Sequence, residues 1–329
     1  MLRFGLFGAG RIGQVHAETL STHPGTRLVA VHDPVPEGAA ALAGRTGARV
    51  AADADEIIGD PEIDAVLIGS PTPTHVDLIT AAVRAGKKVL CEKPIDLSLA
   101  RVDECWHEIS PLDPTVMIGF NRRFDPSFAA VKQRVDRGDI GDLEQLVITS
   151  RDPAPAPAEY IKVSGGIFRD MTIHDFDLAR HFLGDVVEVT VFAANRVEPY
   201  IAEAGDVDSA TVVLKSANGT IATIINSRRC AFGYDQRLEA FGSKGMLQAG
   251  NQTATTVTWS SAAGTAQADP ALDFFLQRYM PAYRAELDHF VSAVEQGVAP
   301  SPDFTDGREA LALAEAANES LRTGCVVKF

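Results

Sequence analysis

Residues 2–13 read LRFGLFGAGRIG, and this stretch decides the fold. The mostly apolar run Leu2–Phe7 predicts a short strand, and the glycine-rich loop GAGRIG follows it at once. After the loop, apolar residues recur at the spacing of one helix face, which predicts a helix. A second predicted strand, residues 27–32, ends at Asp33, twenty residues after the last of these glycines. This strand–loop–helix–strand order is typical of a parallel α/β sheet.

In this context the spacing Gly-x-Gly-x-x-Gly is the fingerprint of dinucleotide binding. Gly8 allows a tight turn, Gly10 lets the backbone approach a pyrophosphate, and Gly13 permits close packing of helix on strand. We expect the phosphates to meet the unpaired N–H groups where the helix begins, at Arg11 and Ile12. A glycine-rich turn that binds no nucleotide is the alternative interpretation.

The acidic residue at the end of the second strand indicates which of the two nicotinamide cofactors the protein binds. The Asp33 carboxylate can accept hydrogen bonds from the adenosine ribose hydroxyls, and it would repel a 2′-phosphate. Pro34 follows it, in place of the Arg or Ser often used to bind a phosphate. The sequence therefore predicts NAD rather than NADP.

Two further strands end in loops that we expect to border the cofactor, because ligands of such sheets bind beyond the carboxyl ends of the strands. The apolar strand 64–70 precedes PTPTH, and the strand 88–91 precedes Glu92-Lys93-Pro94. With a last strand, 115–120, they form a doubly wound parallel Rossmann sheet in an NAD-binding domain over residues 1–121. The cofactor candidates in these loops are Ser70, Thr72, Thr74, His75, Glu92 and Lys93. Packing explains His75 equally well.

The pattern changes to a β-rich second domain over residues 122–329. Strands are expected over residues 144–150, 187–194, 210–215, 220–226, 237–241 and 255–259. Turn signals such as Ala217-Asn218-Gly219 separate them and indicate a mostly antiparallel open sheet. A helix that ends near residue 183 lies on its face, and helices 273–296 and 306–323 precede a short strand, 325–329.

Residues 165–177, which read GGIFRDMTIHDFD, hold the strongest catalytic candidates. Asp170 and His174 are four residues apart, so on a helix both side chains would lie on one face. A carboxylate beside an imidazole tunes and orients the ring as a general base. A purely structural His–Asp contact is the alternative. His181 shares the same face, but no third ligand follows at a recognisable spacing, so no metal site is predicted.

Lys93 stands at the end of a strand and before a proline, which favours an extended backbone. Its flexible ammonium could reach into a cleft and hydrogen-bond a substrate hydroxyl. A surface lysine without such a role is the alternative.

Composition excludes several classes of protein. A length of 329 residues favours two domains, and a net charge of −14 argues against a nucleic-acid surface. The four cysteines form no Cys-x-x-Cys pair, which indicates reduced thiols. The chain enters a strand from Met1 without a basic and apolar leader, and it has no apolar run of roughly 18 residues. We therefore expect a cytoplasmic protein.

Four motifs resemble those of the glucose–fructose oxidoreductase and inositol dehydrogenase (Gfo/Idh/MocA) family. They are FGAGRIG at residues 7–13, EKP at 92–94, GFNRRFD at 119–125 and GGIFRDMTIHDFD at 165–177. The last two, with GYDQR at residues 233–237, are most similar to the bacterial inositol dehydrogenases of the family. The resemblance covers essentially the whole chain.

The resemblance implies a catalytic trio of Lys93, Asp170 and His174. His174 would take the proton of the reacting hydroxyl, Asp170 would bind neighbouring hydroxyls and orient the ring, and Lys93 would anchor the reacting oxygen. Looser candidates for polyol contacts are Arg123, Arg151, Asp152 and Tyr234.

The activity that the resemblance implies is NAD-dependent oxidation of myo-inositol to an inosose, in inositol catabolism. It also implies a homo-oligomer, commonly a tetramer that associates through the sheet of the second domain. Two alternatives stay open: a dehydrogenase or reductase of a sugar or another inositol isomer, and an NAD-binding regulatory protein without turnover.

Overall fold

The computed structural model describes residues 1–329, which fall into two compact units. Unit 1 contains Met1–Phe124 and Pro281–Leu311, and unit 2 contains Asp125–Met280 and Ala312–Phe329. Each unit is thus assembled from two separate stretches of sequence. Neither unit has a helix with both the length and the apolar character needed to cross a membrane.

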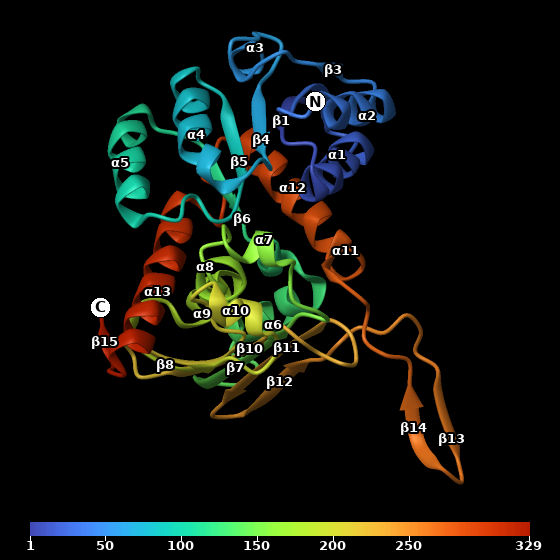
Figure 1. Ribbon diagram of the computed structural model, residues 1–329, viewed down its shortest axis with the longest axis vertical. Helices are drawn as coiled ribbons and strands as arrows, with labels where there is room; N and C mark the ends of the chain where they lie inside the picture. Colours follow the sequence, from blue (N-terminus) through green and yellow to red (C-terminus); the bar gives the residue numbers. More distant parts are fainter. The chain divides into compact units, whose positions relative to one another are not determined.

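Unit 1 is built on a six-stranded parallel sheet with the strand order β3-β2-β1-β4-β5-β6 (Figure 1). The strands are β1 (Leu2–Phe7), β2 (Thr26–His32), β3 (Arg49–Val50), β4 (Ala65–Ile68), β5 (Lys88–Glu92) and β6 (Val116–Gly119). The direction of strand succession reverses between β1 and β4. Doubly wound sheets bind ligands at this point, outside the carboxyl ends of the strands.

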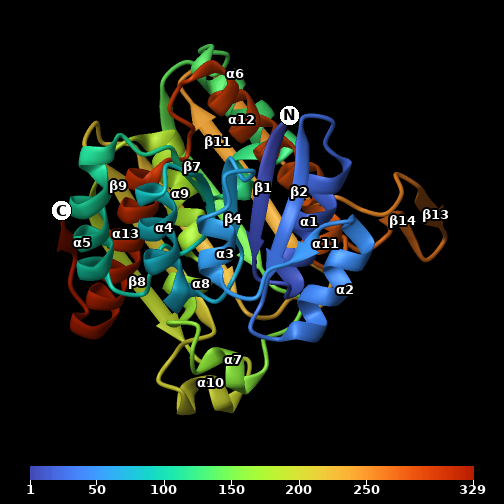
Figure 2. The same cartoon turned by 90° about the horizontal axis from the view of Figure 1, so that it is seen from above.

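Helices connect the strands of unit 1 and cover both faces of its sheet (Figure 2). They are α1 (Arg11–Thr22), α2 (Pro36–Thr46), α3 (Ala54–Ile58), α4 (His75–Arg84), α5 (Leu99–Ile109) and α12 (Met280–Gln296), with the 3₁₀ turns η1 (Thr72–Thr74), η2 (Ser110–Leu112) and η3 (Asn121–Phe124). On one face α12 joins α1 and α2, and its Phe290 ring centroid lies 5.9 Å from that of Phe4. On the other face α3 lies so close that a Cβ on Gly5 would be 2.3 Å from Ile57. Cover on both faces explains why these strands are nearly continuous apolar runs.

Unit 2 is built on a seven-stranded mixed sheet with the order β12-β11-β7-β10-β9-β8-β15. The strands are β7 (Leu143–Arg151), β8 (Val186–Ala194), β9 (Ser209–Ser216), β10 (Ile221–Ser227), β11 (Asp235–Gly242), β12 (Gly245–Ala249) and β15 (Val327–Lys328). Neighbouring strands are antiparallel except β7 and β10, which pair in parallel with Ile148 opposite Ile224. The predicted fold class, a Rossmann sheet followed by a mostly antiparallel open sheet with helices, is confirmed.

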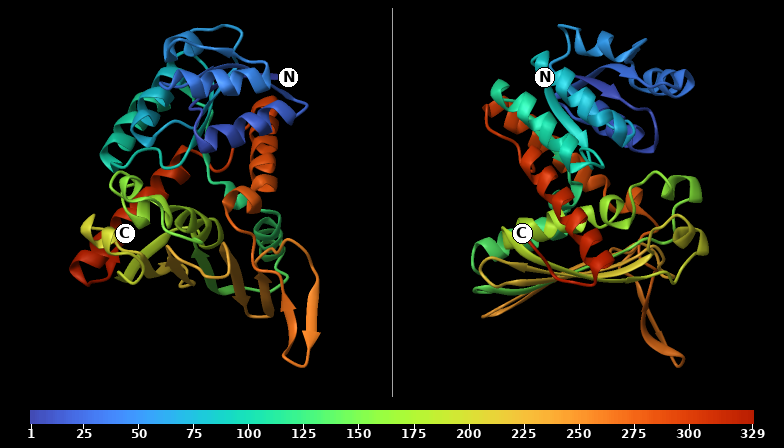
Figure 3. Two further views of the ribbon diagram at one scale, coloured as in Figure 1. Left: turned by 45° about the vertical axis from the view of Figure 1, so that its right-hand side comes forward. Right: turned by 60° about the vertical axis from the view of Figure 1, so that its left-hand side comes forward.

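The helices of unit 2 lie on one face of its sheet, and the other face carries none (Figure 3). The helices are α6 (Pro126–Asp136), α7 (Ala158–Ile161), α8 (Ile167–Asp170), α9 (Ile173–Leu183), α10 (Pro199–Glu203), α11 (Phe275–Arg278) and the C-terminal part of α13 (Phe304–Thr323). Along β10, Ala222 and Ile224 are buried on the helix side, whereas Ile221 is exposed on the open side. This alternation is the pattern expected of a sheet covered on one face.

Two predicted elements form differently, and one strand of the unit 2 sheet was not predicted. The predicted helix 273–296 is two helices, because the backbone at Tyr279 (φ −110°, ψ 6°) leaves the helical conformation between α11 and α12. The predicted strand 255–259 forms instead as β13 (Thr258–Ser261), which pairs only with β14 (Gly264–Ala268) and stays outside the main sheet. β12 was not expected, and it follows β11 through the turn at Gly242.

Candidate active site

The glycine-rich loop connects β1 to α1. Gly8 has a φ of +97°, and a Cβ there would lie 2.6 Å from the carbonyl oxygen of Gly69. A Cβ on Gly13 would lie 2.0 Å from the carbonyl oxygen of Gly8, so α1 packs directly on the loop. Both positions therefore accept only glycine. Gly10 differs, because no atom lies within 4 Å of its Cβ position and the space beside it is open.

The start of α1 fits the pyrophosphate of a dinucleotide. Gly10 is the N-cap residue, it offers no side-chain hydrogen bond, and the first turn from Arg11 contains no acidic residue. No side chain of the helix itself therefore offsets the positive end of its dipole, and its first backbone N–H groups can bind an anion. The open space beside Gly10 lets a phosphate approach this helix end.

Asp33 follows β2 and is tied to the glycine-rich loop. Its Oδ2 accepts a hydrogen bond from the backbone N–H of Ala9 at 2.6 Å, and its Oδ1 accepts one from Val35 N–H at 2.7 Å. Each carboxylate oxygen keeps a second lone pair, so the anchored side chain can still accept a ribose hydroxyl. The geometry fits NAD at this position.

The loop after β4 is held in place by His75, the first residue of α4. Its Nε2 lies 2.8 Å from the Ser70 carbonyl oxygen, and its Nδ1 lies 2.8 Å from the Pro94 carbonyl oxygen. Burial lowers the pKa of His75 in spite of these two acceptors. The ring therefore connects two loops inside the protein. In the same loop, beside Thr72, the Ser70 and Thr74 hydroxyls lie 2.6 Å apart.

Glu92 ends β5 and connects it to α1. Its Oε1 lies 2.7 Å from Nε2 of His16, and its Oε2 accepts the backbone N–H of Lys93 at 3.3 Å. Both His16 and Glu92 are buried. The Glu92 side chain is thus engaged within the protein, and it holds the backbone at Lys93. The Lys93 residue itself is half-buried.

In unit 2, Asp170 and His174 belong to two successive helices rather than to the single helix that their spacing predicts. Asp170 is the last residue of α8 and His174 is the second residue of α9. The helical ladder breaks between them because the N–H of Thr172 donates to the Ile167 carbonyl, five residues back. Met171 and Thr172 keep helical dihedral angles, so the chain continues to turn in the same sense.

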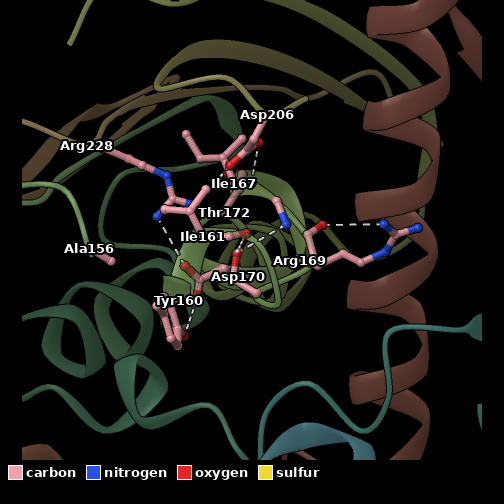
Figure 4. A network of polar contacts seen from close by, with 12 residues as sticks. Ala156, Tyr160, Ile161, Ile167, Arg169, Asp170, Thr172, Asp206 and Arg228 are labelled. Carbon is pink, nitrogen blue, oxygen red and sulfur yellow. Dashed lines mark hydrogen bonds and ion pairs between the residues drawn. The ribbon is translucent and has the colours of Figure 1, made fainter. Parts of the chain in front are cut away.

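A network of polar contacts holds the Asp170 carboxylate, with a buried arginine on one side and the half-exposed Tyr160 on the other (Figure 4). The Tyr160 hydroxyl donates to its Oδ1 at 2.8 Å, and Nη1 of Arg228 donates to its Oδ2 at 3.2 Å. Nη2 of the same Arg228 donates to Oδ2 of Asp206 at 3.3 Å. Burial, followed by the charge of Asp170, raises the pKa of Tyr160, so its hydroxyl stays protonated and acts as a donor.

Asn226, two residues before Arg228, holds the start of α9. Its Oδ1 accepts the Thr172 hydroxyl at 2.7 Å, and its Nδ2 donates to Oδ2 of Asp175 at 2.8 Å. Sequence reasoning gave no role to four members of these contacts: Tyr160, Asp206, Asn226 and Arg228. The alternation of β10 could have indicated two of them. Asn226 is a polar residue on the buried face of this apolar strand, and Arg228, two residues later, continues the same face.

The looser substrate candidates of unit 2 lie together where three neighbouring strands of its sheet, β11, β7 and β10, end or begin. Arg151 ends β7, opposite Ser227 of β10 and Asp235 of β11, and its Nη1 lies 2.6 Å from Oδ2 of Asp235. The backbone N–H of Asp152 donates to the Ser227 carbonyl at 2.9 Å. Tyr234 precedes Asp235 and is buried. These strand ends also carry Arg228, which follows Ser227 in the chain.

Arg123 belongs to unit 1 and is paired there. Its Nη2 lies 3.0 Å from Oδ1 of Asp306, its Nη1 donates to the Ser301 hydroxyl at 3.2 Å, and its side chain is 6% exposed. The predicted residues thus divide between the units. Lys93 and the cofactor candidates belong to unit 1, whereas Asp170 and His174 belong to unit 2.

Two family models match the chain. The model described as "Oxidoreductase family, NAD-binding Rossmann fold" matches residues 2–120, and the "GFO/IDH/MocA C-terminal domain" matches residues 128–248. The inositol 2-dehydrogenase of Rhizobium meliloti (strain 1021) is 50% identical over 321 residues, which cover 97% of this chain and 97% of that protein.

Solved structures of similar proteins extend over the whole chain. The crystal structure of a myo-inositol dehydrogenase from Corynebacterium glutamicum ATCC 13032 is 54% identical, with a TM-score of 0.98, and covers 100% of this chain and 99% of that one. The crystal structure of a scyllo-inositol dehydrogenase from Lactobacillus casei, with bound cofactor NAD(H) and scyllo-inositol, is 30% identical. Its TM-score is 0.92, and it covers 100% of this chain and 99% of that one.

The glycine-rich loop, Asp33 and the open helix start agree with the first family model, and the matches extend through both units. NAD is therefore the cofactor of this protein, which belongs to the GFO/IDH/MocA family of oxidoreductases.

Proposed function

We propose that this protein is an NAD-dependent inositol 2-dehydrogenase that oxidises myo-inositol to 2-keto-myo-inositol, the scyllo-inosose. The observation that carries the proposal is the support of Asp170 by hydrogen bonds from Tyr160 and from the buried Arg228, four residues before His174. A carboxylate held in this way can orient a base and bind a hydroxyl. The likeness to inositol 2-dehydrogenase of Rhizobium meliloti, at 50% identity over 97% of the chain, supports the substrate.

In the proposed reaction, His174 accepts the proton of the substrate hydroxyl while the C–H bond of the same carbon breaks and the ketone forms. Bound NAD supplies the hydride acceptor. Asp170 orients His174 and accepts hydrogen bonds from neighbouring substrate hydroxyls. Lys93 donates to the reacting oxygen and steadies the charge that builds on it.

The two units divide this work. Unit 1 binds NAD through the loop at Gly8–Gly13 and through Asp33, and residues after β4 and β5 border the nicotinamide side. Unit 2 binds the polyol, with Arg151, Asp152 and Tyr234, where β7 ends and β11 begins, as further contacts.

A panel of polyols with NAD tests the proposal by the absorbance of the reduced cofactor. Myo-inositol should give the highest kcat/KM, ahead of scyllo-inositol, other inositol isomers and aldoses. A higher value for scyllo-inositol would favour the second candidate, which the 30% identical scyllo-inositol dehydrogenase supports. Tight NAD binding without turnover on any polyol would instead indicate a regulatory protein.

We further propose that the protein is a homotetramer that associates through the open face of the unit 2 sheet. This face exposes one large apolar side chain on each of four strands: Phe192 (74% exposed), Ile221 (43%), Phe241 (43%) and Met246 (49%). Phe241 and Met246 are direct cross-strand neighbours, and exposed apolar patches mark protein interfaces. Light scattering should give the tetramer mass for the natural chain and a lower mass for Phe192→Glu; a monomeric natural chain would contradict the proposal.

A cytoplasmic location in inositol catabolism completes the proposed function. All four cysteines are free thiols, and Cys91, Cys105 and Cys230 are buried. Unpaired thiols persist in reducing compartments. Fractionation of cells that express the protein should recover it with cytoplasmic markers.

A further inference from the structure

Arg228 is connected to both ends of α8, the four-residue helix that ends in Asp170, directly at one end and through Asp206 at the other. At its N-terminal end, the backbone N–H of Ile167 donates to Oδ1 of Asp206 at 2.9 Å, and Oδ2 of Asp206 pairs with Nη2 of Arg228. At its C-terminal end, Oδ2 of Asp170 pairs with Nη1 of Arg228 at 3.2 Å. Figure 4 shows the Arg228 guanidinium on the side of α8 where the two carboxylates lie.

This cluster is shielded from water. The Arg228 side chain is 1% exposed, that of Asp170 is 15% exposed and that of Asp206 is 10% exposed. Charges in such surroundings are screened less than surface charges, so each acts more strongly on its neighbours. Burial alone would lower the pKa of Arg228, but the carboxylates of Asp170 and Asp206 raise it above its usual value. The cation therefore persists at every pH at which the enzyme works.

We propose that Arg228 is a positioning residue for the reaction, which fixes the Asp170 carboxylate near His174 and offsets part of its negative charge. The inference rests on the proposed roles of Asp170 and His174. Arg228 lies outside the four motifs that carry the family resemblance. Its planar fork suits this task, since two separate N–H groups reach two carboxylates at once.

The other charged and titratable groups around Asp170 come from several elements. Tyr160 of α7 donates to it directly, and the charge of Asp152, after β7, acts on both Tyr160 and Arg228. Nη2 of Arg169, on α8, lies 3.8 Å from Oε1 of Glu315, on α13. Asp175 of α9 accepts a hydrogen bond from Asn226. Arg228 differs in its connections, because it pairs with Asp170 at one end of α8 and with Asp206, which binds Ile167 N–H, at the other.

The proposal predicts pH shifts of opposite sign for two substitutions. A carboxylate raises the pKa of a neighbouring imidazole, and a cation that offsets this carboxylate reduces the effect. Arg228→Gln should therefore raise the pKa of His174 and move the rising limb of the oxidation rate to higher pH. Asp206→Asn keeps the oxygen that accepts Ile167 N–H but leaves more of the Arg228 charge to act on Asp170. This substitution should move the limb to lower pH.

The test measures kcat/KM for myo-inositol against pH at saturating NAD. It also follows the ring titration of His174 by NMR, with its signal assigned from its loss in His174→Asn. We expect shifts of about 0.5–1 pH unit, below the 1–3 units of a charge in direct contact. The matched control is Arg229→Gln. It removes the same charge one residue along the chain, where Arg229 is exposed and donates to the Arg196 carbonyl at 3.3 Å.

Two results would overturn the proposal. In the first, the oxidation rate of Arg228→Gln rises at the same pH as that of Arg229→Gln. In the second, Asp206→Asn moves this pH in the same direction as Arg228→Gln. Arg228→Lys keeps the charge without the fork, so its limb should stay near that of the natural chain while kcat falls on the order of tenfold. If Arg228→Gln does not fold, the lysine and Asp206→Asn variants decide the question. If no polyol is oxidised, the proposed function fails, and the NMR titration still tests Arg228 by itself.

Discussion

Nε2 of His16 lies 2.7 Å from Oε1 of Glu92, which connects the helix after the glycine-rich loop to the end of β5, one residue before Lys93. The ring of Tyr283 packs edge-on against His16, with centroids 5.5 Å apart. Glu286, three residues later on α12, is fully buried, and neither of its carboxyl oxygens has a hydrogen-bond partner. The two loops on which the cofactor proposal rests are therefore joined through a buried cluster that α12 completes.

The free energy of unfolding of Glu286→Gln, relative to that of the natural chain, should increase as the pH rises. Burial, followed by the charge of Glu92, raises the pKa of Glu286 well above its usual value. The folded protein therefore retains this proton after the unfolded chain has lost it near pH 4.3. Stability from the neutral acid is complete below that pH and is lost as the pH rises through the folded pKa.

The measurement is the free energy of unfolding from urea titrations between pH 4 and pH 9. Glutamine stays neutral, so the variant should gain on the natural chain by about 1–3 kcal/mol at the alkaline end. Glu295→Gln, at an exposed position of the same helix, is the control and should show no such trend. A Glu286→Gln difference that is constant with pH would show that Glu286 does not titrate in this range.

Lys93→Ala should lower turnover on the order of 10²-fold while NAD binding stays within a few-fold. The reason is that the proposed role of Lys93 is to donate to the reacting oxygen. Turnover comes from steady-state rates and NAD affinity from fluorescence titration. The control is Lys88→Ala, at the start of β5, the strand that precedes Lys93. Normal turnover with collapsed NAD binding would make Lys93 a cofactor residue only.

Asp33→Asn should erode the preference for NAD over NADP on the order of tenfold, which corresponds to about 1.4 kcal/mol. Asparagine keeps one oxygen for the N–H of Ala9 or Val35 but removes the charge that repels a 2′-phosphate. The readout is the ratio of kcat/KM for the two cofactors. Glu37→Gln removes an exposed charge in the first turn of α2 and should leave the ratio unchanged. Equal or better use of NADP by the natural chain would refute the assignment.

His174→Ala should lose about 10²–10⁴-fold in turnover and flatten the rising limb of the pH profile, because a positioned base contributes on that order. The control is His181→Ala, seven residues further along α9. A folded His174→Ala protein that binds NAD and keeps its pH limb would assign the proton to another group.

Asp170→Asn should raise KM, slow turnover and move the limb to lower pH, since a neighbouring carboxylate raises the pKa of an imidazole. The measurement is again kcat and kcat/KM against pH. Tyr160→Phe removes one hydrogen bond to Asp170 but leaves its charge, so it should move the limb much less. A limb that is the same in Asp170→Asn and in the natural chain would separate Asp170 from the base.

Local pattern was enough to predict the Rossmann sheet and its glycine-rich loop. The reason for Gly13 is a steric contact with the Gly8 carbonyl, five residues back, and Gly8 needs its positive φ for the turn itself. Only the contact of Gly8 with Gly69, after β4, depends on the tertiary structure. Apolar runs and alternation likewise report burial on two faces or one. Asp170 and His174 could be singled out because four residues separate them, although the break at Thr172 could not be foreseen.

Tertiary structure decided which side chains support this pair and which are already engaged. Arg228 is 58 residues from Asp170 in the chain and Arg123 is 183 residues from Asp306, so no local pattern predicts either pair. Residues 281–311 return to unit 1 after the chain has passed through unit 2, and no local pattern predicts this return either. A periodic sequence determines which face of an element is buried, whereas the register of one element on another determines which charges meet.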